Sequence, residues 1–284
     1  MVRNDLHEIN RLSWNAATVR HNSHKPDQAG FLRGGGSTLF PEELELLGEV
    51  KGKDVVHLLC NSGQDTLSIA ARGARVTGVD ISDEAIAFAK QLSADSGIPA
   101  HFERSDVYPW LEAAVAEGRQ YDIVFSSYGA LCWLSDLERW MQLVAGILKP
   151  GGRFVCIEFH QVAMIFDEKA VPKYDYSMPE PLHWEIGISD YVGDSSGGLV
   201  ASGEVKVSEP FVNPNPCYEF QRSMGEILGA VLNSGLRLRH YHEYLHSNGW
   251  KPFAEMKPLP GRKWTMPDGV PKLPLMYRLM AVKE

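Results

Sequence analysis

Short apolar runs alternate along this chain with stretches in which apolar residues recur at helical spacing. Residues 55–59 form a run of the length expected for a strand covered on both faces, and turn residues follow at positions 61–63. A helix is expected over residues 64–71, and a second strand, rich in β-branched residues, over residues 75–79. This strand, loop, helix and strand unit is typical of an open α/β sheet.

Three more strands are expected at residues 100–104, 121–125 and 153–159. The helix after the second strand should begin at Ser82, a favourable N-cap residue, and end at Gly97. The helix before the fifth strand should begin with a capping box formed by Ser135 and Glu138. The sequence K-P-G-G at residues 149–152 should stop that helix.

The two ends of the chain show a weaker pattern. Residues 1–40 are polar and contain three consecutive glycines, which predicts a mobile loop, and a short helix should follow over residues 41–50. Alternation in residues 184–189 and 203–207 predicts an inserted hairpin. A helix over residues 218–233 and strands over residues 236–244 and 275–282 should complete the sheet. The expected parts are a lid (1–40), a core (41–159), an inserted substrate cover (160–217) and a C-terminal completion of the sheet (218–284).

Asp80 occupies the position that most strongly suggests a ligand. It follows the second strand, where parallel strands end at the edge that binds ligands in open α/β sheets. A carboxylate just under ~20 residues after the loop glycine is placed to accept hydrogen bonds from the two hydroxyls of a ribose. The helix that follows Gly63 has free N–H groups facing the same loop. The residues therefore favour a nucleoside-containing cofactor, although such units also occur in α/β proteins that bind no nucleoside.

The sequence V-V-H-L-L-C-N-S-G-Q, from position 55 to position 64, resembles motif I of class I S-adenosylmethionine-dependent methyltransferases, which usually reads V-L-D-L-G-C-G-T-G-Q. His57 stands in place of the usual acid, and Leu59 and Asn61 replace two glycines. Cys60 and Gly63 are retained, as is the acid at position 80. The K-P-G-G sequence before the fifth strand is a second mark of the family. The resemblance implies a Rossmann-like α/β fold: a mostly parallel seven-stranded sheet with an antiparallel last strand, here with an N-terminal lid and a β-rich insert.

The resemblance also implies that S-adenosylmethionine is the cofactor. The family pattern gives Asp106 a contact with the adenine amino group, and a role as the cap of the next helix is the alternative. Trp14 would contact the cofactor from the lid or, alternatively, pack a helix onto the surface. The predicted cofactor-binding residues are Trp14, His57, Leu59, Cys60, Asn61, Gly63, Asp80, Ile81, Ser105, Asp106, Val107, Ser126 and Ser127.

The predicted catalytic residues are His160, Tyr128 and Tyr176. His160 follows the fifth strand and would serve as a general base if the acceptor must lose a proton. A structural histidine bonded to backbone is the alternative. Tyr128, Tyr176 and Trp14 are candidates for cation–π contact with the sulfonium, and core packing is the alternative for each.

Composition limits the possible partners. The formal charge of −8 and the isoelectric point near 5.7 give no attraction to phosphate backbones, so nucleic acid is not expected as a partner. Four cysteines without C-x-x-C spacing indicate neither a zinc site nor a disulfide framework, and no metal is expected. No signal peptide or membrane span is expected, which predicts a cytoplasmic protein. The sequence leaves the oligomeric state open, as a monomer or a homodimer.

Three functions remain open at this point. The first is methyl transfer from S-adenosylmethionine to a small, largely apolar or aromatic metabolite. The second uses the same cofactor for cyclisation or aminocarboxypropyl transfer, since the altered motif I loop would hold the cofactor's tail differently. The third is a non-catalytic protein that binds the cofactor or a partner.

Overall fold

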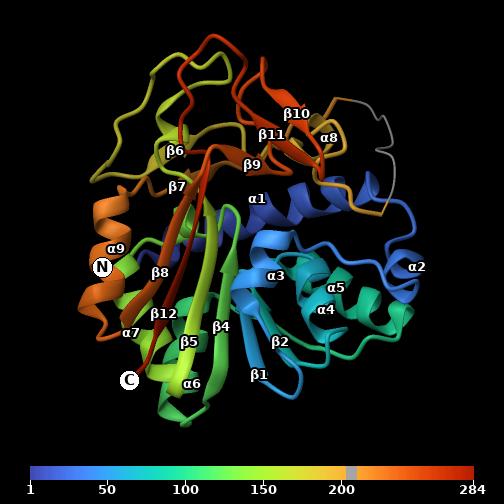
Figure 1. Cartoon of the computed structure of the whole chain (residues 1–284), viewed down its shortest axis with the longest axis vertical. Coiled ribbons are helices and arrows are strands. Elements are labelled where there is room, and N and C mark those ends of the chain that lie inside the picture. The colour runs from blue at the N-terminus through green and yellow to red at the C-terminus, as the bar shows by residue number, and fades with distance from the viewer. Residues whose placement is uncertain (203–209) are drawn as a thin grey trace.

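A computed structural model describes residues 1–202 and 210–284 (Figure 1). Its centre is a seven-stranded sheet with the strand order β3-β2-β1-β4-β5-β12-β8. The strands are β1 (Asp54–Leu58), β2 (Arg75–Asp80), β3 (His101–Arg104), β4 (Tyr121–Ser127), β5 (Leu148–Phe159), β8 (Arg237–Tyr244) and β12 (Met276–Val282).

The direction of the strands matches the expected topology. Strands β1 to β5 pair in parallel, with Val55 opposite Val76 on one side and opposite Ile123 on the other. The last strand, β12, runs antiparallel between β5 and β8. The predicted fold class is therefore confirmed: the sheet has seven strands, is mostly parallel, and has an antiparallel last strand.

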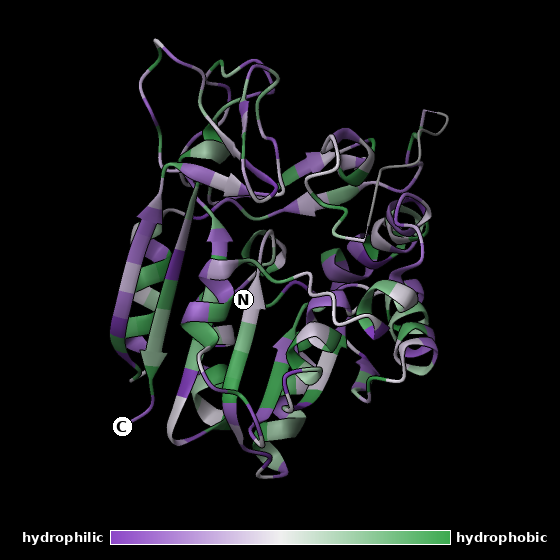
Figure 2. Cartoon of the chain, turned by 45° about the vertical axis from the view of Figure 1, so that its right-hand side comes forward, coloured by the Kyte–Doolittle hydropathy of each residue, from purple (hydrophilic) through white to green (hydrophobic). Residues whose placement is uncertain are grey.

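Helices cover both faces of this sheet. They are α3 (Pro41–Leu47), α4 (Gln64–Ala70), α5 (Asp83–Ser96), α6 (Val107–Ala116), α7 (Leu137–Ile147) and α9 (Met224–Asn233). One face packs on α6, α7 and α9 through Val56, Val124 and their neighbours, and the other packs on α3 and α4 through Val55 and Ile123. Because both faces are covered, the central strands are almost continuously apolar, as Figure 2 shows.

The N-terminal segment differs from its prediction. Residues 1–40 are not an irregular loop, because they form α1 (Asn4–Ser23) and the short α2 (Gln28–Arg33). The buried positions of α1 are mostly polar, and they include His7, Asn10, Ser13 and His21. A helix that buries polar side chains has no apolar stripe, so hydrophobic periodicity could not reveal it.

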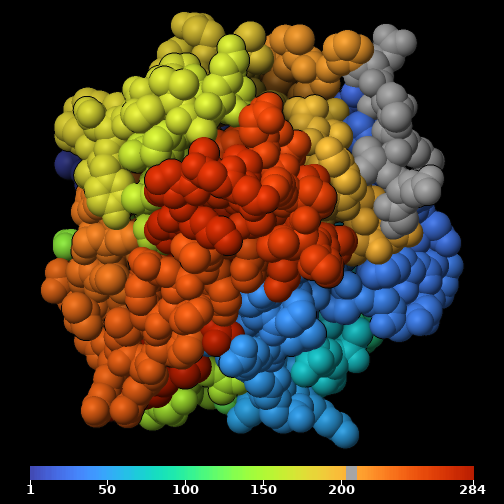
Figure 3. All heavy atoms as spheres, turned by 45° about the horizontal axis from the view of Figure 1, so that its top comes forward, coloured from blue at the N-terminus to red at the C-terminus, as the bar shows by residue number. Residues whose placement is uncertain are grey.

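The chain after β5 forms a cover over the carboxyl ends of the strands. It contains β6 (Leu182–Trp184), α8 (Tyr191–Asp194), β7 (Cys217–Glu219), β9 (His246–Asn248), β10 (Lys257–Leu259) and β11 (Lys263–Thr265), with 3₁₀ turns η1 (Leu131–Trp133) and η2 (Ala163–Ile165) nearby. Figure 3 shows this cover from outside, with the yellow-green chain after β5 beside the orange-red C-terminal segment.

The hairpin expected in the insert is partly wrong. Strand β6 ends at Trp184 and pairs with β7, so residues 185–189 of the expected strand are not in a strand, and α8 begins only at Tyr191. The second expected strand, over residues 203–207, lies outside the described residues. No local pattern predicts the small sheet β10-β11-β9, because its strands are only three residues long.

Two predicted helix starts are also wrong. The N-cap of α7 is Asp136, whose carboxylate accepts from the Arg139 N–H at 3.0 Å, while the Ser135 hydroxyl accepts from the N–H of Arg3. An aspartate one position later therefore replaces the expected capping box. Helix α9 begins at Met224 and not at position 218, because Ser223 and Glu226 form a capping box there.

All four cysteines are described and free, and three of them are buried. In residues 1–202 and 210–284, no helix is both long enough and apolar enough to cross a membrane. The same residues contain no group of three or more potential ligands arranged to hold a metal ion.

Candidate functional site

A cavity of ≈ 720 Å³ lies between the carboxyl ends of the strands, helix α1 and the cover. This volume falls in the range that small-molecule sites usually occupy. Two parts of its wall differ in chemistry. We call Asn61, Asp80, Ile81, Asp106 and Val107 the Asp80 side, and Tyr128, Cys132, Trp133, Phe159, Glu219 and Trp250 the Tyr128 side.

Backbone N–H groups hold the carboxylate of Asp80 at the end of β2. The N–H of Asn61 donates to Oδ2 at 2.8 Å, and the N–H of Ser82 donates to Oδ1 at 2.9 Å. Burial nevertheless raises the pKa of Asp80 to about 6, since desolvation outweighs these bonds. Each carboxylate oxygen keeps a further lone pair, so Asp80 can still accept hydrogen bonds from a ligand in the cavity.

The motif I loop has a glycine-like backbone at two positions that lack glycine. Leu59 has φ 55° and Asn61 has φ 47°, in the left-handed region that favours glycine. Asparagine tolerates this region, and the Asn61 side-chain oxygen accepts from the Ser62 N–H at 2.7 Å. A leucine in this conformation is strained. The family's loop shape therefore survives, although two of its glycines do not.

Gly63 supports this loop without lining the cavity. It has φ 76°, and a Cβ placed there would lie 2.8 Å from the side chains of Ala89 and Phe102. Only glycine therefore allows the start of α4 to pack this closely against α5 and β3.

His57 occupies the position of the usual acid, on β1 beneath the loop. Its Nδ1 lies 2.9 Å from the hydroxyl of Thr66, and its Nε2 is buried without a hydrogen-bond partner in the described structure. Desolvation lowers the pKa of His57 to about 4. The ring is therefore neutral at physiological pH and does not reproduce the charge of a carboxylate.

Helix α1 is fixed over the Asp80 side by polar contacts. The Asn15 side-chain oxygen accepts from the Ser82 hydroxyl at 2.7 Å, and its amide donates to Asp83 at 3.1 Å. Further along α1, the Asn22 amide donates to the Ser62 hydroxyl at 2.8 Å. These bonds tie the N-terminal segment to both loops that surround Asp80.

Asp106 combines two of the roles considered for it. As the N-cap of α6 it accepts from the Tyr108 N–H at 3.0 Å, and its other oxygen lies 2.7 Å from His7 Nδ1. Its side chain also lines the cavity. The capping alternative is thus observed, and the adenine contact stays a prediction.

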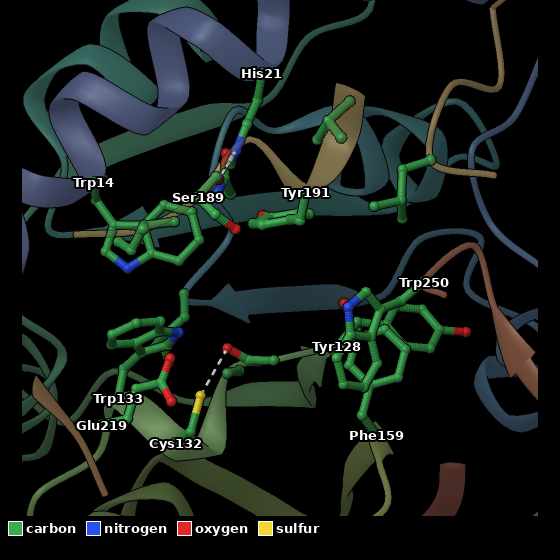
Figure 4. Close-up of a pocket in the computed structure, with 18 of the residues that line it drawn as sticks. Trp14, His21, Tyr128, Cys132, Trp133, Phe159, Ser189, Tyr191, Glu219 and Trp250 are labelled. Atoms are coloured by element: carbon green, nitrogen blue, oxygen red, sulfur yellow. Dashed lines mark hydrogen bonds between the residues drawn. The ribbon is translucent and has the colours of Figure 1, made fainter. Parts of the chain in front are cut away.

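The Tyr128 side is aromatic. Tyr128 packs on Phe40 and Phe159, with ring centroids 6.1 and 5.3 Å apart, and Trp250 lies 4.5 Å from Phe159. The Tyr128 hydroxyl accepts from the Asn248 amide at 2.8 Å, and its φ of 37° is unusual for a non-glycine residue. Figure 4 shows the rings of Tyr128, Phe159 and Trp250 close together, apart from Trp133 and Glu219 of the same side and from Trp14.

Glu158 fixes the loop that carries this side. Its buried carboxylate accepts from the N–H groups of Ala130 at 2.8 Å, Leu131 at 3.1 Å and Phe159 at 2.7 Å, and also from Gly129. Burial raises the pKa of Glu158 despite these bonds. A single side chain on β5 thus organises the turn after β4.

Most of the predicted site residues meet in the cavity. Those that line it are Trp14, His57, Leu59, Cys60, Asn61, Asp80, Ile81, Asp106, Val107, Ser127 and Tyr128. Gly63, Ser105 and Ser126 do not line it. The Ser105 hydroxyl donates to the backbone of Asp106 at 2.9 Å, and Ser126 is buried in β4.

His160 and Tyr176 are not brought to the cavity. His160 Nδ1 accepts from the Val162 N–H at 3.1 Å, and its Nε2 lies 3.1 Å from Glu243, so both ring nitrogens have protein partners. Tyr176 is 38% exposed, and its hydroxyl accepts from the Met224 N–H. This placement favours the structural alternative for His160, and neither residue enters our proposal.

Several lining residues lie outside the prediction. From α1, His7, Asn10 and His21 line the cavity beside Trp14, and the cover adds Tyr191 and Glu219. The sequence does contain a pattern that marks the lining residues of α1. Positions 7, 10, 14 and 21 follow the helical spacing of three, four and seven residues, but the pattern is polar and aromatic instead of apolar. Nothing local marks Glu219.

Sequence comparison agrees with this geometry. Residues 55–152 match the sequence family described as "Methyltransferase domain". The chain therefore contains a methyltransferase domain over these residues. The resemblance of motif I makes S-adenosylmethionine the expected cofactor, and the matched segment runs from β1 to the K-P-G-G sequence in β5.

Relatives of the methyltransferase domain are similar over limited regions. The chain is 33% identical over 108 residues to the ubiquinone biosynthesis O-methyltransferase of Nitrosomonas europaea, which covers 38% of this chain and 44% of that protein. The chain thus spans less than half the length of such relatives. Its fold resembles an S-adenosylmethionine-dependent methyltransferase structure from Mesorhizobium loti, with TM-score 0.57, 21% identity, and coverage of 87% of this chain and 99% of the other. A structure from Clostridium acetobutylicum gives TM-score 0.51 at 13% identity, covering 81% and 83%.

Proposed function

We propose that this chain transfers the methyl group of S-adenosylmethionine to a small molecule that has an apolar or aromatic portion. One observation carries the proposal: the Asp80 side and the Tyr128 side belong to the same cavity. The first offers a backbone-held carboxylate for a ribose, and the second offers aromatic rings for an acceptor.

The reaction needs little chemistry from the protein. A lone pair of the acceptor attacks the methyl carbon in line with the departing sulfur, the carbon–sulfur bond breaks, and the sulfonium becomes the neutral thioether of S-adenosylhomocysteine. Holding the two reactants in line supplies ~7–11 kcal/mol of the barrier reduction. The cover and α1 enclose the cavity, so they would also exclude water.

Each side has a defined part in this proposal. Asp80 would accept from the ribose hydroxyls, and the cavity wall at Ile81, Asp106 and Val107 would receive the adenine. Helix α1 would act as the lid, with Trp14 facing the reacting groups. Tyr128, at the end of β4, would position the acceptor, and its strained backbone is typical of a functional position.

Binding of the cofactor tests the Asp80 part of the proposal. We expect micromolar affinity for S-adenosylmethionine in calorimetry, reduced at least tenfold in Asp80→Ala, because charged hydrogen bonds contribute about 1.5–3 kcal/mol. Asp95→Ala removes an exposed carboxylate of α5 and is the matched control, for which we expect unchanged affinity. Full affinity in a folded Asp80→Ala protein would exclude the ribose contact.

Product analysis tests the reaction itself. Turnover with an accepted substrate should release S-adenosylhomocysteine. Release of methylthioadenosine would instead show attack on the cofactor's aminocarboxypropyl tail, and this result would contradict methyl transfer.

A further inference from the structure

The carboxylate of Glu219 lies in the wall of the cavity on the Tyr128 side. It belongs to β7, which is held beside η1 by a hydrogen bond from the Phe220 N–H to the Cys132 carbonyl at 2.7 Å. Figure 4 shows it next to Trp133 and Cys132, facing the open space of the cavity. Among the residues that line the cavity, it is an acid with no part in the mechanism above.

No protein cation neutralises this carboxylate in the part of the chain that the structure describes. None of the ion pairs there includes Glu219. Desolvation is the main cause that raises its pKa. Burial, and to a smaller extent the carboxylate of Glu219, raises the pKa of the thiols of Cys132 and Cys217. A carboxylate removed from water without a counter-charge is costly, so a ligand that supplies a positive charge would be favoured here.

Aromatic rings surround the same region. The Trp14 ring lies 5.4 Å from Trp133 and 6.5 Å from Tyr191, both at 78°, so three rings meet edge to face at this part of the cavity. Trp184 belongs to the same cluster. Faces of tryptophan and tyrosine attract organic cations, and a cage of such rings is the usual way in which proteins bind ammonium groups.

Of the other titratable groups near these rings, His21 and Tyr191 are uncharged, while the charge of Lys25 acts on His21. The ring centroids of His21 and Tyr191 lie 4.2 Å apart with the planes tilted by 57°, and desolvation lowers the pKa of His21 to about 4, so His21 is neutral at physiological pH. Burial raises the pKa of Tyr191, which keeps its hydroxyl neutral. Lys25 also lines the cavity, but the charge that acts on it is that of Asp65. No protein cation pairs with Glu219 in the described residues, so a cationic ligand would favour the ionised form of this carboxylate.

We propose that the acceptor carries an organic ammonium group, which Glu219 and the rings of Trp14, Trp133 and Tyr191 bind. The proposal rests on the proposed methyl transfer and narrows the acceptor to an amine or quaternary ammonium compound. It concerns binding alone, and it does not require the charged nitrogen to be the atom that is methylated.

Matched pairs of probes test this proposal without knowledge of the acceptor. Choline and 3,3-dimethylbutan-1-ol have the same shape but differ in charge, and 2-phenylethylamine and 2-phenylethanol form a second, aromatic pair. Binding is measured by calorimetry and by quenching of tryptophan fluorescence, with the protein saturated with S-adenosylhomocysteine. We expect the cation of at least one pair to bind tenfold or more tightly than its neutral partner.

The variant Glu219→Gln keeps the size of the side chain and removes its charge. We expect it to reduce the preference for the cation to less than threefold, while Glu185→Gln, at a side chain that is 89% exposed near the same strand, should leave the preference unchanged. Absence of a preference in both pairs would overturn the proposal, as would a preference that persists in Glu219→Gln. Comparison of the cationic and neutral probes with the wild-type protein tests the proposal even if Glu219→Gln does not fold.

A cofactor control separates this proposal from the proposed function. If Glu219 bound the sulfonium, Glu219→Gln would weaken S-adenosylmethionine more than S-adenosylhomocysteine, which lacks the charge, and the assignment to the acceptor would fail. We expect both affinities to remain within twofold of wild type. If the wild-type protein did not bind S-adenosylmethionine at all, the proposed function itself would be rejected.

Discussion

The two sides of the cavity are built in different ways. On the Asp80 side, contacts between neighbouring loops hold the polar groups: Asn61 and Ser82 bond to Asp80, and Asp106 caps its own helix. On the Tyr128 side, residues from β4, β5, β7 and the segment after β9 meet although they are far apart in the chain. The first arrangement is local and depends on backbone N–H groups, whereas the second depends on side-chain packing.

This difference predicts how each side responds to change. A local loop that is fixed by its own backbone should tolerate disruption elsewhere in the protein. A side assembled from distant segments should fail when one organising group is lost. The four predictions that follow run from the largest expected effect to the smallest.

Glu158→Gln should cause the largest change. The amide has one acceptor oxygen in place of two, so buried N–H groups of the loop after β4 lose their partners, and each such group costs about 1–3 kcal/mol. We expect the free energy of unfolding to fall by about 3 kcal/mol in urea titrations. We also expect turnover to fall while S-adenosylhomocysteine affinity stays within twofold.

Glu138→Gln, at an exposed position of α7, is the control for this experiment and should change stability by less than ~0.5 kcal/mol. If Glu158→Gln weakened cofactor binding as much as turnover, the two sides would not be independent.

Acid should weaken cofactor binding on the Asp80 side. The ionised carboxylate is the better acceptor for ribose hydroxyls, and the pKa of Asp80 is raised to about 6, so protonation below that pH removes the binding form. Affinity for S-adenosylhomocysteine should be constant from pH 7 to 7.5 and then fall about tenfold per pH unit below 6. Calorimetry at pH 5.0, 6.0 and 7.5 measures this.

The Asp80→Asn variant should bind S-adenosylhomocysteine weakly, and its affinity should not depend on pH in this way. The pKa values of His57 and His21, near 4, lie below the tested range, and that of Lys25, near 8, lies above it. A pH profile that is unchanged in Asp80→Asn would assign the titration to another group.

Asn15→Ala tests whether α1 positions the Asp80 side. The variant loses the bonds to the Ser82 hydroxyl and the Asp83 carboxylate, at about 1 kcal/mol for a typical hydrogen bond. We expect S-adenosylhomocysteine affinity to fall about fivefold. The control Asn233→Ala, at an exposed position of α9, should leave this affinity unchanged. An equal loss of affinity in both variants would contradict the role of α1 as a lid.

A pair of substitutions at Leu59 tests the strained loop. Glycine adopts the left-handed backbone that alanine avoids, so Leu59→Gly should be more stable than Leu59→Ala by about 1 kcal/mol. Both variants lose the same side-chain packing, which removes that effect from the difference. Lys90 is an exposed position in α5 and serves as the control. There Lys90→Ala should be more stable than Lys90→Gly, because alanine is the better helix former. Urea unfolding of the four variants measures both differences, and the same order at both sites would contradict the strain.

Local patterns predicted the central half of the fold well. The apolar runs from β1 to β5 identified buried strands, and Ser82 and Gly97 marked both ends of α5 as expected. Asp80 and Asp106 were found because they follow strands directly, and in a parallel sheet such positions meet at one edge. The prediction of a loop over the first 40 residues was wrong because α1 buries polar side chains against the cavity instead of apolar side chains against the core.

By itself, the sequence determined the sheet, the position of Asp80 and the resemblance to methyltransferases. Strand periodicity and short-range turn chemistry are enough for these features. Only the tertiary structure decided that His160 faces Glu243 and not the cavity, that Glu158 holds the loop after β4, and that Glu219 lies among aromatic rings. Each of these depends on contacts between residues that are far apart in the chain. Glu158 and Leu131 are 27 residues apart, and His160 and Glu243 are 83 residues apart. Local periodicity does not encode such contacts.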